Sequence, residues 1–314
     1  MDNDSKLLFQ FASQSFERLK ELDKTTIKNV NEREYIEKCR EVYKSVISKV
    51  PSMILKANRE YPFLYFFYGS TMYYLNKNNP DRELRENSIR LIKTALSNCP
   101  PQDVLEYERQ LLEILFNERK FSEAAVYCEH YLRFFPKDKN YLKLMVEILQ
   151  KLNRINECFP YARKLIDIDS YDYESYTNLG KLYLSSRMYN DAMTAFQRSK
   201  ELEPKFPDNY KYIGIIYLIS NKKVLAGSNF KTAIGKKIYN FEQYEKSYKT
   251  SGSDTRDDER NTLLFLFEVY INLIKCGEDY RKELLDVEKK LRTNSYLTTQ
   301  QIESFKRKSK IDLI

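Results

Sequence analysis

The side chains that could carry out catalysis are few in this sequence. His130 is the single histidine among 314 residues, so a serine or cysteine nucleophile would depend on it as a general base. It lies in YCEHYLRFF, which has the pattern of a helix rather than of the strand-to-helix turn that exposes a nucleophile. Asp167 and Asp169, in IDIDSYDYE, could act as paired carboxylates, but acidic residues are also expected there because they stabilise the start of a following helix. We expect no catalytic residues and no enzyme.

Motifs that bind metals or phosphates are also missing from the sequence. It contains no paired CxxC, no HExxH, no GxGxxG and no GxxxxGK, so we expect no metal and no cofactor. The five cysteines are Cys39, Cys99, Cys128, Cys158 and Cys276. Their odd number and wide spacing favour reduced thiols in the cytoplasm over a disulfide framework.

The net charge of +8 permits an anionic partner without requiring one. Lysine and arginine are interleaved with aspartate and glutamate, whereas a nucleic-acid surface gathers basic residues on one face. The densest basic run, FKRKSK at 305–310, is interpreted as a solvated tail, with a weak anion or membrane-surface contact as the alternative.

The most apolar stretches, 61–75 and 262–276, are too short for a membrane span and predict buried core helices. The N-terminus lacks the pattern of a signal peptide, so the sequence indicates a soluble, cytoplasmic protein.

The residues that would position any site recur with a fixed period. Four consecutive rows of equal length, 105–138, 139–172, 173–206 and 207–240, align without a gap. Column seven of each row is large and apolar, column eight is Leu, Val, Gly and Gly, and column twenty is always small. The residues in these three columns are Leu111, Met145, Leu179 and Ile213; Leu112, Val146, Gly180 and Gly214; and Ala124, Cys158, Ala192 and Ala226.

Each column has a physical role in a pair of helices. A period of this length is filled by two helices of three to four turns and a short connection. Large residues at columns seven and eleven share one face of the first helix. Small residues at columns eight and twenty allow the paired helices to approach closely, with Gly180 expected to face Ala192. The aromatic residue at column twenty-four fills the gap to the next pair, and Pro136 and Pro204 end the second helix of their rows.

These residues resemble the tetratricopeptide repeat family. The segment YTNLGKLYLSSRMYNDAMTAFQRSKELEP of the third row matches well, with Tyr176 where the family often has Trp. The match is strong over 173–236 and fair over 105–172. The resemblance implies an all-α fold, a right-handed superhelical solenoid of antiparallel helix pairs.

The repeats divide the chain into four expected parts. Residues 1–60 form an N-terminal helical cap, from amphipathic patterns at 3–22 and 32–50, and residues 61–104 form a degenerate helix pair. Residues 105–240 are the four tandem repeats. Residues 241–314 form a C-terminal helical region, in which the polar segment 249–260 is the best candidate for a disordered loop.

In arrays that resemble this family, the first helix of each pair lines a concave groove. The residues that the resemblance places in the groove are Arg109, Glu113, Asn117, Lys143, Glu147, Lys151, Asn178, Lys181, Tyr212 and Ile215. The fourth row becomes apolar, at Tyr212, Ile215 and Leu218, and an apolar stripe needs cover. Either a partner segment fills it or, as we favour, residues 241–293 fold back over it.

A groove that clamps the terminal carboxylate of a partner, as in chaperone-binding members of the family, is disfavoured. Lys143 and Asn178 fit that pattern, but Glu147 and Asp208 would repel a carboxylate, and Tyr212 stands where a basic residue is needed.

The sequence therefore predicts a non-enzymatic scaffold or adaptor that binds a segment of a protein partner in the groove of a helical solenoid. This function is implied by the resemblance and not by a catalytic or binding motif. The alternatives are a nucleic-acid-associated protein that uses the positive charge, and a homo-oligomeric structural protein.

Overall fold

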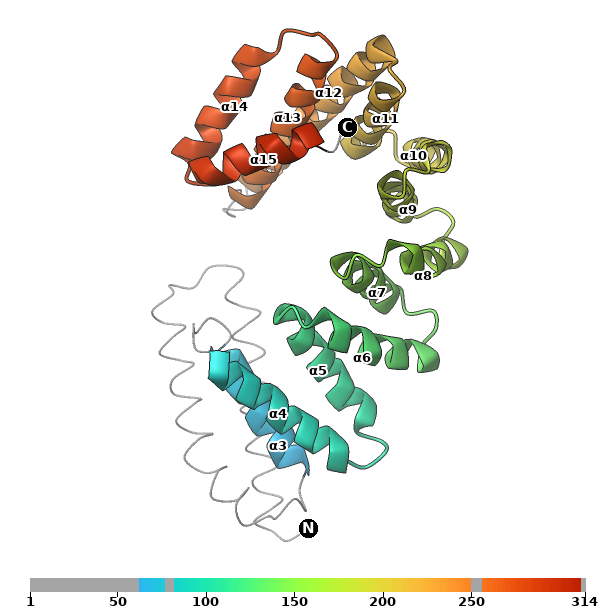
Figure 1. The fold of residues 1–314 in the computed structure, drawn as a ribbon, viewed down its shortest axis with the longest axis vertical. Coiled ribbons are helices and arrows are strands. Elements are labelled where there is room, and N and C mark those ends of the chain that lie inside the picture. The colour runs from blue at the N-terminus through green and yellow to red at the C-terminus, as the bar shows by residue number, and fades with distance from the viewer. Residues whose placement is uncertain (1–61, 77–81, 250–255, 312–314) are drawn as a thin grey trace. The chain divides into compact units, whose positions relative to one another are not determined.

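A computed structural model describes residues 62–76, 82–249 and 256–311 of the chain. All regular structure in these residues is α-helical, and the helices pack in consecutive pairs (Figure 1). The predicted all-α fold of paired helices is confirmed. The predicted N-terminal cap at 1–60 lies outside the described residues.

The chain forms two compact units that divide between Arg154 and Ile155. The described helices of the first unit are α3 (Pro62–Asn76), α4 (Arg82–Asn98), α5 (Val104–Asn117), α6 (Phe121–Phe134) and α7 (Lys139–Lys151). Those of the second unit are α8 (Ile155–Ile168), α9 (Tyr173–Ser185), α10 (Tyr189–Leu202), α11 (Pro207–Ile219), α12 (Lys223–Lys249), α13 (Arg256–Lys275), α14 (Arg281–Thr293) and α15 (Thr299–Ile311). The domain limits expected at 60, 104 and 240 stay predictions.

The same turn joins the two helices of every row. Arg119, Asn153, Arg187 and Asn221, which all occupy column fifteen, have a positive φ of 57–59°. In each turn the next residue donates its backbone N–H to a carbonyl five residues earlier, as Lys120 does to Leu115 at 2.8 Å and Met188 does to Tyr183 at 2.8 Å. This bond closes the Schellman motif, which satisfies the last carbonyls of a helix. The repeat therefore extends to the backbone conformation, without a glycine at the left-handed position.

The glycines of rows three and four make room for an aromatic ring. A methyl group on Gly180 would lie 2.7 Å from the ring of Phe196, and one on Gly214 would lie 2.7 Å from the ring of Phe230. Close approach was predicted here, but the expected partner of Gly180, Ala192, was wrong. The ring at column twenty-four crosses to the glycine of its own row. Phe196 also stacks on Tyr212 of the next row, with the ring centroids 5.0 Å apart, so it fills the gap between pairs as expected.

The sizes of the side chains at columns eight and twenty-four vary in opposite directions from row to row. Row one has Leu112 and Cys128 at these columns, both buried, whereas rows three and four have a glycine and a phenylalanine. A large residue in one column is thus accompanied by a small one in the other, because the space between two packed helices is close to constant.

The second helix of row four has no proline to end it. Rows one and three have Pro136 and Pro204 after α6 and α10, but Ile238 occupies that column in row four, and α12 continues to Lys249. Residues 250–255 of the loop expected at 249–260 lie outside the described residues, whereas Lys249 ends α12 and Arg256 begins α13. Asp257, Asp258 and Glu259 in its first turn favour a helix start.

The two most apolar stretches are core helices, as predicted. In α3, Leu64, Phe66 and Tyr73 are buried, and α13 buries residues from Thr262 to Leu273. Within the residues that the structure describes, none of the helices has both the length and the apolarity needed to cross a membrane. The basic run 305–310 lies within α15.

We expect Gly180→Ala to lower the thermal midpoint of unfolding. The added methyl must displace the Phe196 ring, and overpacking of this kind costs about 1–3 kcal/mol, which exceeds the gain of about 1 kcal/mol in helix propensity. The matched control is Gly235→Ala in α12, where a methyl meets no described atom within 4 Å and only the propensity gain applies. Equal thermal shifts for the two variants, measured by circular dichroism, would show that the Gly180 contact does not matter.

Candidate functional site

A hollow of about 330 Å³ opens between α5 and α7 in the first unit. Side chains from the first helices of rows one and two line it. They are Glu106, Arg109, Gln110, Leu112, Glu113, Phe116, Asn140, Tyr141 and Leu144. The lining lies on the first helices of two rows, which are the helices that the family resemblance assigned to a concave groove.

The ten predicted groove residues are distributed over both units. Arg109 and Glu113 line the hollow. Four others are exposed on the same two helices, at Asn117, Lys143, Glu147 and Lys151, but do not line it. The remaining four, Asn178, Lys181, Tyr212 and Ile215, lie in the second unit.

Arg109 bridges the hollow from α5 to α7. Its Nε donates a hydrogen bond to the Tyr141 hydroxyl oxygen at 3.1 Å, and its Nη1 lies 3.4 Å from the Glu106 carboxylate. Tyr141 is itself held by stacking on Tyr131, with the ring centroids 3.8 Å apart. The guanidinium charge is therefore already engaged by two neighbours within the hollow.

Glu113 is oriented by a buried tyrosine from α3. The Tyr74 hydroxyl donates to Glu113 Oε1 at 3.2 Å, and Gln110 Nε2 donates to the Tyr74 oxygen at 2.9 Å. Both Tyr74 and Gln110 are buried, whereas Glu113 is exposed. The four aligned rows give no sign of this support, because Tyr74 lies outside them.

The wall of the hollow is apolar between these polar groups. Leu112 is buried in it, while Phe116, Tyr141 and Leu144 are half-buried and keep part of their surface open. A surface with an apolar wall and a few oriented polar groups is typical of sites that bind a peptide or a small ligand.

The candidate catalytic side chains have structural surroundings. His130 Nδ1 lies 2.6 Å from Glu108 Oε2, and this pair ties α6 to α5. Burial raises the pKa of the Cys128 thiol to about 12 and that of Cys158 to about 11, which keeps both thiols protonated and unreactive at neutral pH. Cys99, Cys128, Cys158 and Cys276 form no disulfide, and Cys39 lies outside the described residues.

In the second unit, Lys211 of α11 is a buried cation held by carboxylates. Its ammonium lies 3.0 Å from Glu268 of α13 and 3.3 Å from Asp208, and only 7% of its side chain is exposed. Burial is the largest single influence and by itself lowers the pKa of Lys211, but Glu268, Tyr212 and Asp208 together outweigh it and the pKa is raised. Lys211 therefore stays charged and joins the fourth row to the C-terminal region.

Aromatic rings extend this contact on both sides. The Lys211 ammonium lies 4.6 Å from the centroid of the Tyr212 ring and 4.9 Å from that of Phe265. The ammonium of Lys181, a predicted groove residue, lies 5.4 Å from the centroid of the same Tyr212 ring. Burial lowers the pKa of Lys181. Tyr212 is half-buried and contacts Phe196 and two lysines of the same chain.

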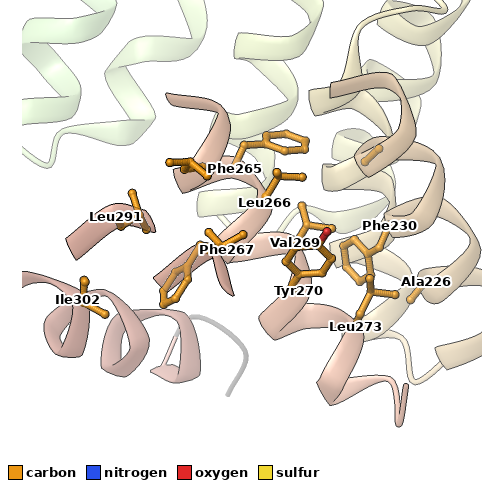
Figure 2. Packing of buried hydrophobic residues seen from close by; sticks show 13 residues of the cluster. Ala226, Phe230, Phe265, Leu266, Phe267, Val269, Tyr270, Leu273, Leu291 and Ile302 are labelled. Atoms are coloured by element: carbon orange, nitrogen blue, oxygen red, sulfur yellow. The ribbon is translucent and has the colours of Figure 1, made fainter. Parts of the chain in front are cut away.

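The C-terminal helices cover the apolar part of row four. Ile215 and Leu218 pack against a buried cluster formed by α12, α13, α14 and α15. Figure 2 shows this cluster, with Phe230 of α12 beside Val269 and Tyr270 of α13. This packing agrees with the favoured interpretation at Ile215 and Leu218, whereas cover of the whole apolar stripe by residues 241–293 stays a prediction. Ile215 therefore contacts the chain itself rather than an open groove.

Thr177, on the first helix of row three, is also buried. Its hydroxyl lies 2.7 Å from that of Ser199 and donates to Asn209 Oδ1 at 3.0 Å, so it joins α9 to α10 and α11. In the second unit, several side chains expected on the groove surface thus hold neighbouring rows together.

One repeat of the chain matches a known protein family. Residues 173–206, the whole of the third row, match the family model of the tetratricopeptide repeat, which confirms the resemblance. No curated protein sequence matches the chain.

Several solved structures are similar in fold. A structure of MamA is 17% identical, with 49% of this chain and 90% of that chain covered and a TM-score of 0.44. MamA from Desulfovibrio magneticus RS-1 is 16% identical, with coverage of 56% and 94% and a TM-score of 0.45. YrrB, described as a TPR protein with an unusual peptide-binding site, is 17% identical, with coverage of 59% and 91% and a TM-score of 0.45. At these scores, function does not transfer from those proteins to this chain.

We expect Glu268→Gln to destabilise the second unit by about 1.5–3 kcal/mol, because it leaves the buried Lys211 ammonium with one carboxylate instead of two. Because the pKa of Lys211 is raised in the folded state, the stabilisation is complete at neutral pH and is lost only as pH rises through that raised pKa. Urea denaturation at pH 7 measures the effect.

The matched control is Glu278→Gln, which removes the partner of Lys231 in a solvent-exposed ion pair between α12 and the connection from α13 to α14. Exposed pairs of this kind contribute little, so the denaturation midpoint should hardly move. If both glutamate variants shift the midpoint equally, burial of Lys211 is not the source of the stabilisation.

Proposed function

We propose that this protein is a non-enzymatic scaffold or adaptor that binds a segment of a protein partner in the hollow between α5 and α7. The observation that carries the proposal is the lining of that hollow. It combines apolar side chains with oriented polar ones on the first helices of two successive repeats. The volume, about 330 Å³, suits a few side chains of a peptide or a helix.

A protein segment fits the lining better than a nucleic acid does. The hollow contains the two carboxylates of Glu106 and Glu113 and the single guanidinium of Arg109. Phosphate groups would be repelled by the carboxylates, and the guanidinium is already bound to Tyr141 and Glu106. We therefore place the alternative nucleic-acid function second.

The exposed groove residues outside the hollow extend the proposed surface. On α5 and α7 these are Asn117, Lys143, Glu147 and Lys151, and they would form a polar rim around the apolar centre. Asn178 is an exposed candidate of the second unit, and Lys181 is half-buried beside Tyr212. A cytoplasmic location suits the buried thiols of Cys128 and Cys158, which form no disulfide.

Filling the hollow should abolish partner binding. We expect peptides selected from a displayed random library against the wild-type protein to bind the double variant Asn140→Trp, Leu144→Trp at least tenfold more weakly, because the indoles occupy the space between α5 and α7. Fluorescence anisotropy with the labelled peptides measures the affinities.

The control places two tryptophans on the exposed outer face of α6, as Val126→Trp, Glu129→Trp. It should bind the selected peptides as the wild type does. Both variants must first show the helical content and melting behaviour of the wild type. Selected peptides that bind the filled variant undiminished would place the binding surface elsewhere.

A further inference from the structure

The lining of the hollow between α5 and α7 carries more negative than positive charge. Its lining includes two carboxylates, Glu106 and Glu113, and one guanidinium, Arg109. Arg109 lies 3.4 Å from Glu106 and donates to Tyr141, so these two opposite charges largely neutralise each other. The charge that remains for a ligand is that of Glu113.

Glu113 presents one carboxylate oxygen without a donor. Its Oε1 accepts the hydrogen bond from Tyr74, whereas Oε2 receives no hydrogen bond or ion pair from any residue that the structure describes. Because Tyr74 is buried and is held by Gln110, the carboxylate is fixed in position before a ligand arrives. An acceptor that is already oriented loses little conformational entropy when it binds a cation.

The neighbouring helix positions do not neutralise Glu113. Four residues before it is Arg109, which points to Tyr141, and four residues after it is the uncharged Asn117. The corresponding glutamate of row two, Glu147, has lysines at both of these positions, Lys143 and Lys151. Glu113 is therefore the carboxylate on this surface that is best placed to attract a cationic side chain.

Apolar surface lies within one helical turn of this carboxylate. Phe116 is three residues after Glu113 and shares its face of α5, while Tyr141 and Leu144 face it from α7. A lysine or arginine side chain could lay its methylene stem on Phe116 and Tyr141 and direct its charged end to Glu113. An adjacent apolar side chain of the same ligand would contact Leu144.

We propose that the hollow recognises a basic-apolar segment of a partner protein, in which a lysine or arginine stands next to a large apolar residue. This inference rests on the proposed function and names the chemistry of its ligand. It is the opposite of a groove that clamps a carboxylate, because the fixed charge is a glutamate. An acidic segment or a nucleic acid would meet two carboxylates and no unengaged cation among the lining residues.

The first test uses two variants that change the lining charge by one unit in opposite directions. The probes are fluorescein-labelled peptides recovered from the displayed random library, restricted to those whose binding the Asn140→Trp, Leu144→Trp variant abolishes. We expect Glu113→Gln to weaken their binding about threefold to tenfold, because it removes the ionic acceptor. Arg109→Gln should tighten binding about twofold to fivefold, because it removes the competing cation and releases Glu106.

The second test changes the charge on the peptide. Synthetic versions in which each lysine or arginine becomes glutamine should bind about threefold to tenfold more weakly, and versions with glutamate more weakly still. Raising the salt concentration from 50 to 300 mM should weaken the original peptides more than the glutamine versions.

The outcomes separate this inference from the proposed function. Peptides that depend on the hollow but are acidic or uncharged, or that bind Glu113→Gln and wild type equally, would overturn the basic-apolar ligand while the binding hollow stands. If no selected peptide is sensitive to the filled hollow, both the proposed function and this inference fail.

Discussion

The contact on which rows one, three and four depend is the close approach of the two helices within the row. In rows three and four it is made by a glycine on the first helix and a buried phenylalanine ring on the second. A residue with a side chain at Gly180 or Gly214 would separate the helices or expel the ring. The distance between the paired helices then sets how far each ring reaches toward the following row, where Phe196 stacks on Tyr212. The contact between the glycine and the phenylalanine ring therefore affects packing both within a row and between rows.

Polar contacts determine which surfaces stay open to a partner. In the second unit, the groove columns are used internally, by Thr177 with Asn209 and by Lys211 with Glu268. In the first unit, the same columns carry exposed side chains around the hollow, and a buried tyrosine orients one of them. Two surfaces built on the same repeat thus differ: one makes contacts within the chain, and the other keeps side chains exposed around the hollow.

The fold could be predicted because its signal is local and repeated. A fixed spacing of large, small and aromatic residues recurs four times, so chance agreement is small, and the helix pairs follow from it. The partner of Gly180 was wrong because the residues at columns twenty and twenty-four are both buried beside it, and spacing alone does not show which one crosses the interface. The left-handed turns at column fifteen were missed, because two of the four residues there are arginines, which carry no turn signal.

The candidate site was only half predictable for a related reason. The groove columns identified Arg109 and Glu113, since their orientation is fixed by helical periodicity. Which columns are covered depends on contacts distant in sequence, such as that of Lys211 with Glu268, 57 residues later. The helix that supplies Glu268 lacks the repeat signature, and Tyr74 lies in a degenerate pair, so neither contact could be inferred from aligned rows.

The long helix α12 has a consequence for assembly. A stack of identical repeats has no intrinsic end, since the last repeat presents to solvent the same apolar face that each earlier one buries. Here, a helix that lacks its terminal proline runs past the end of its row, and Ile215 and Leu218 pack against the cluster that α12 forms with α13, α14 and α15. A repeat of another molecule that stacked on these two residues would have to displace the contacts that they make with that cluster.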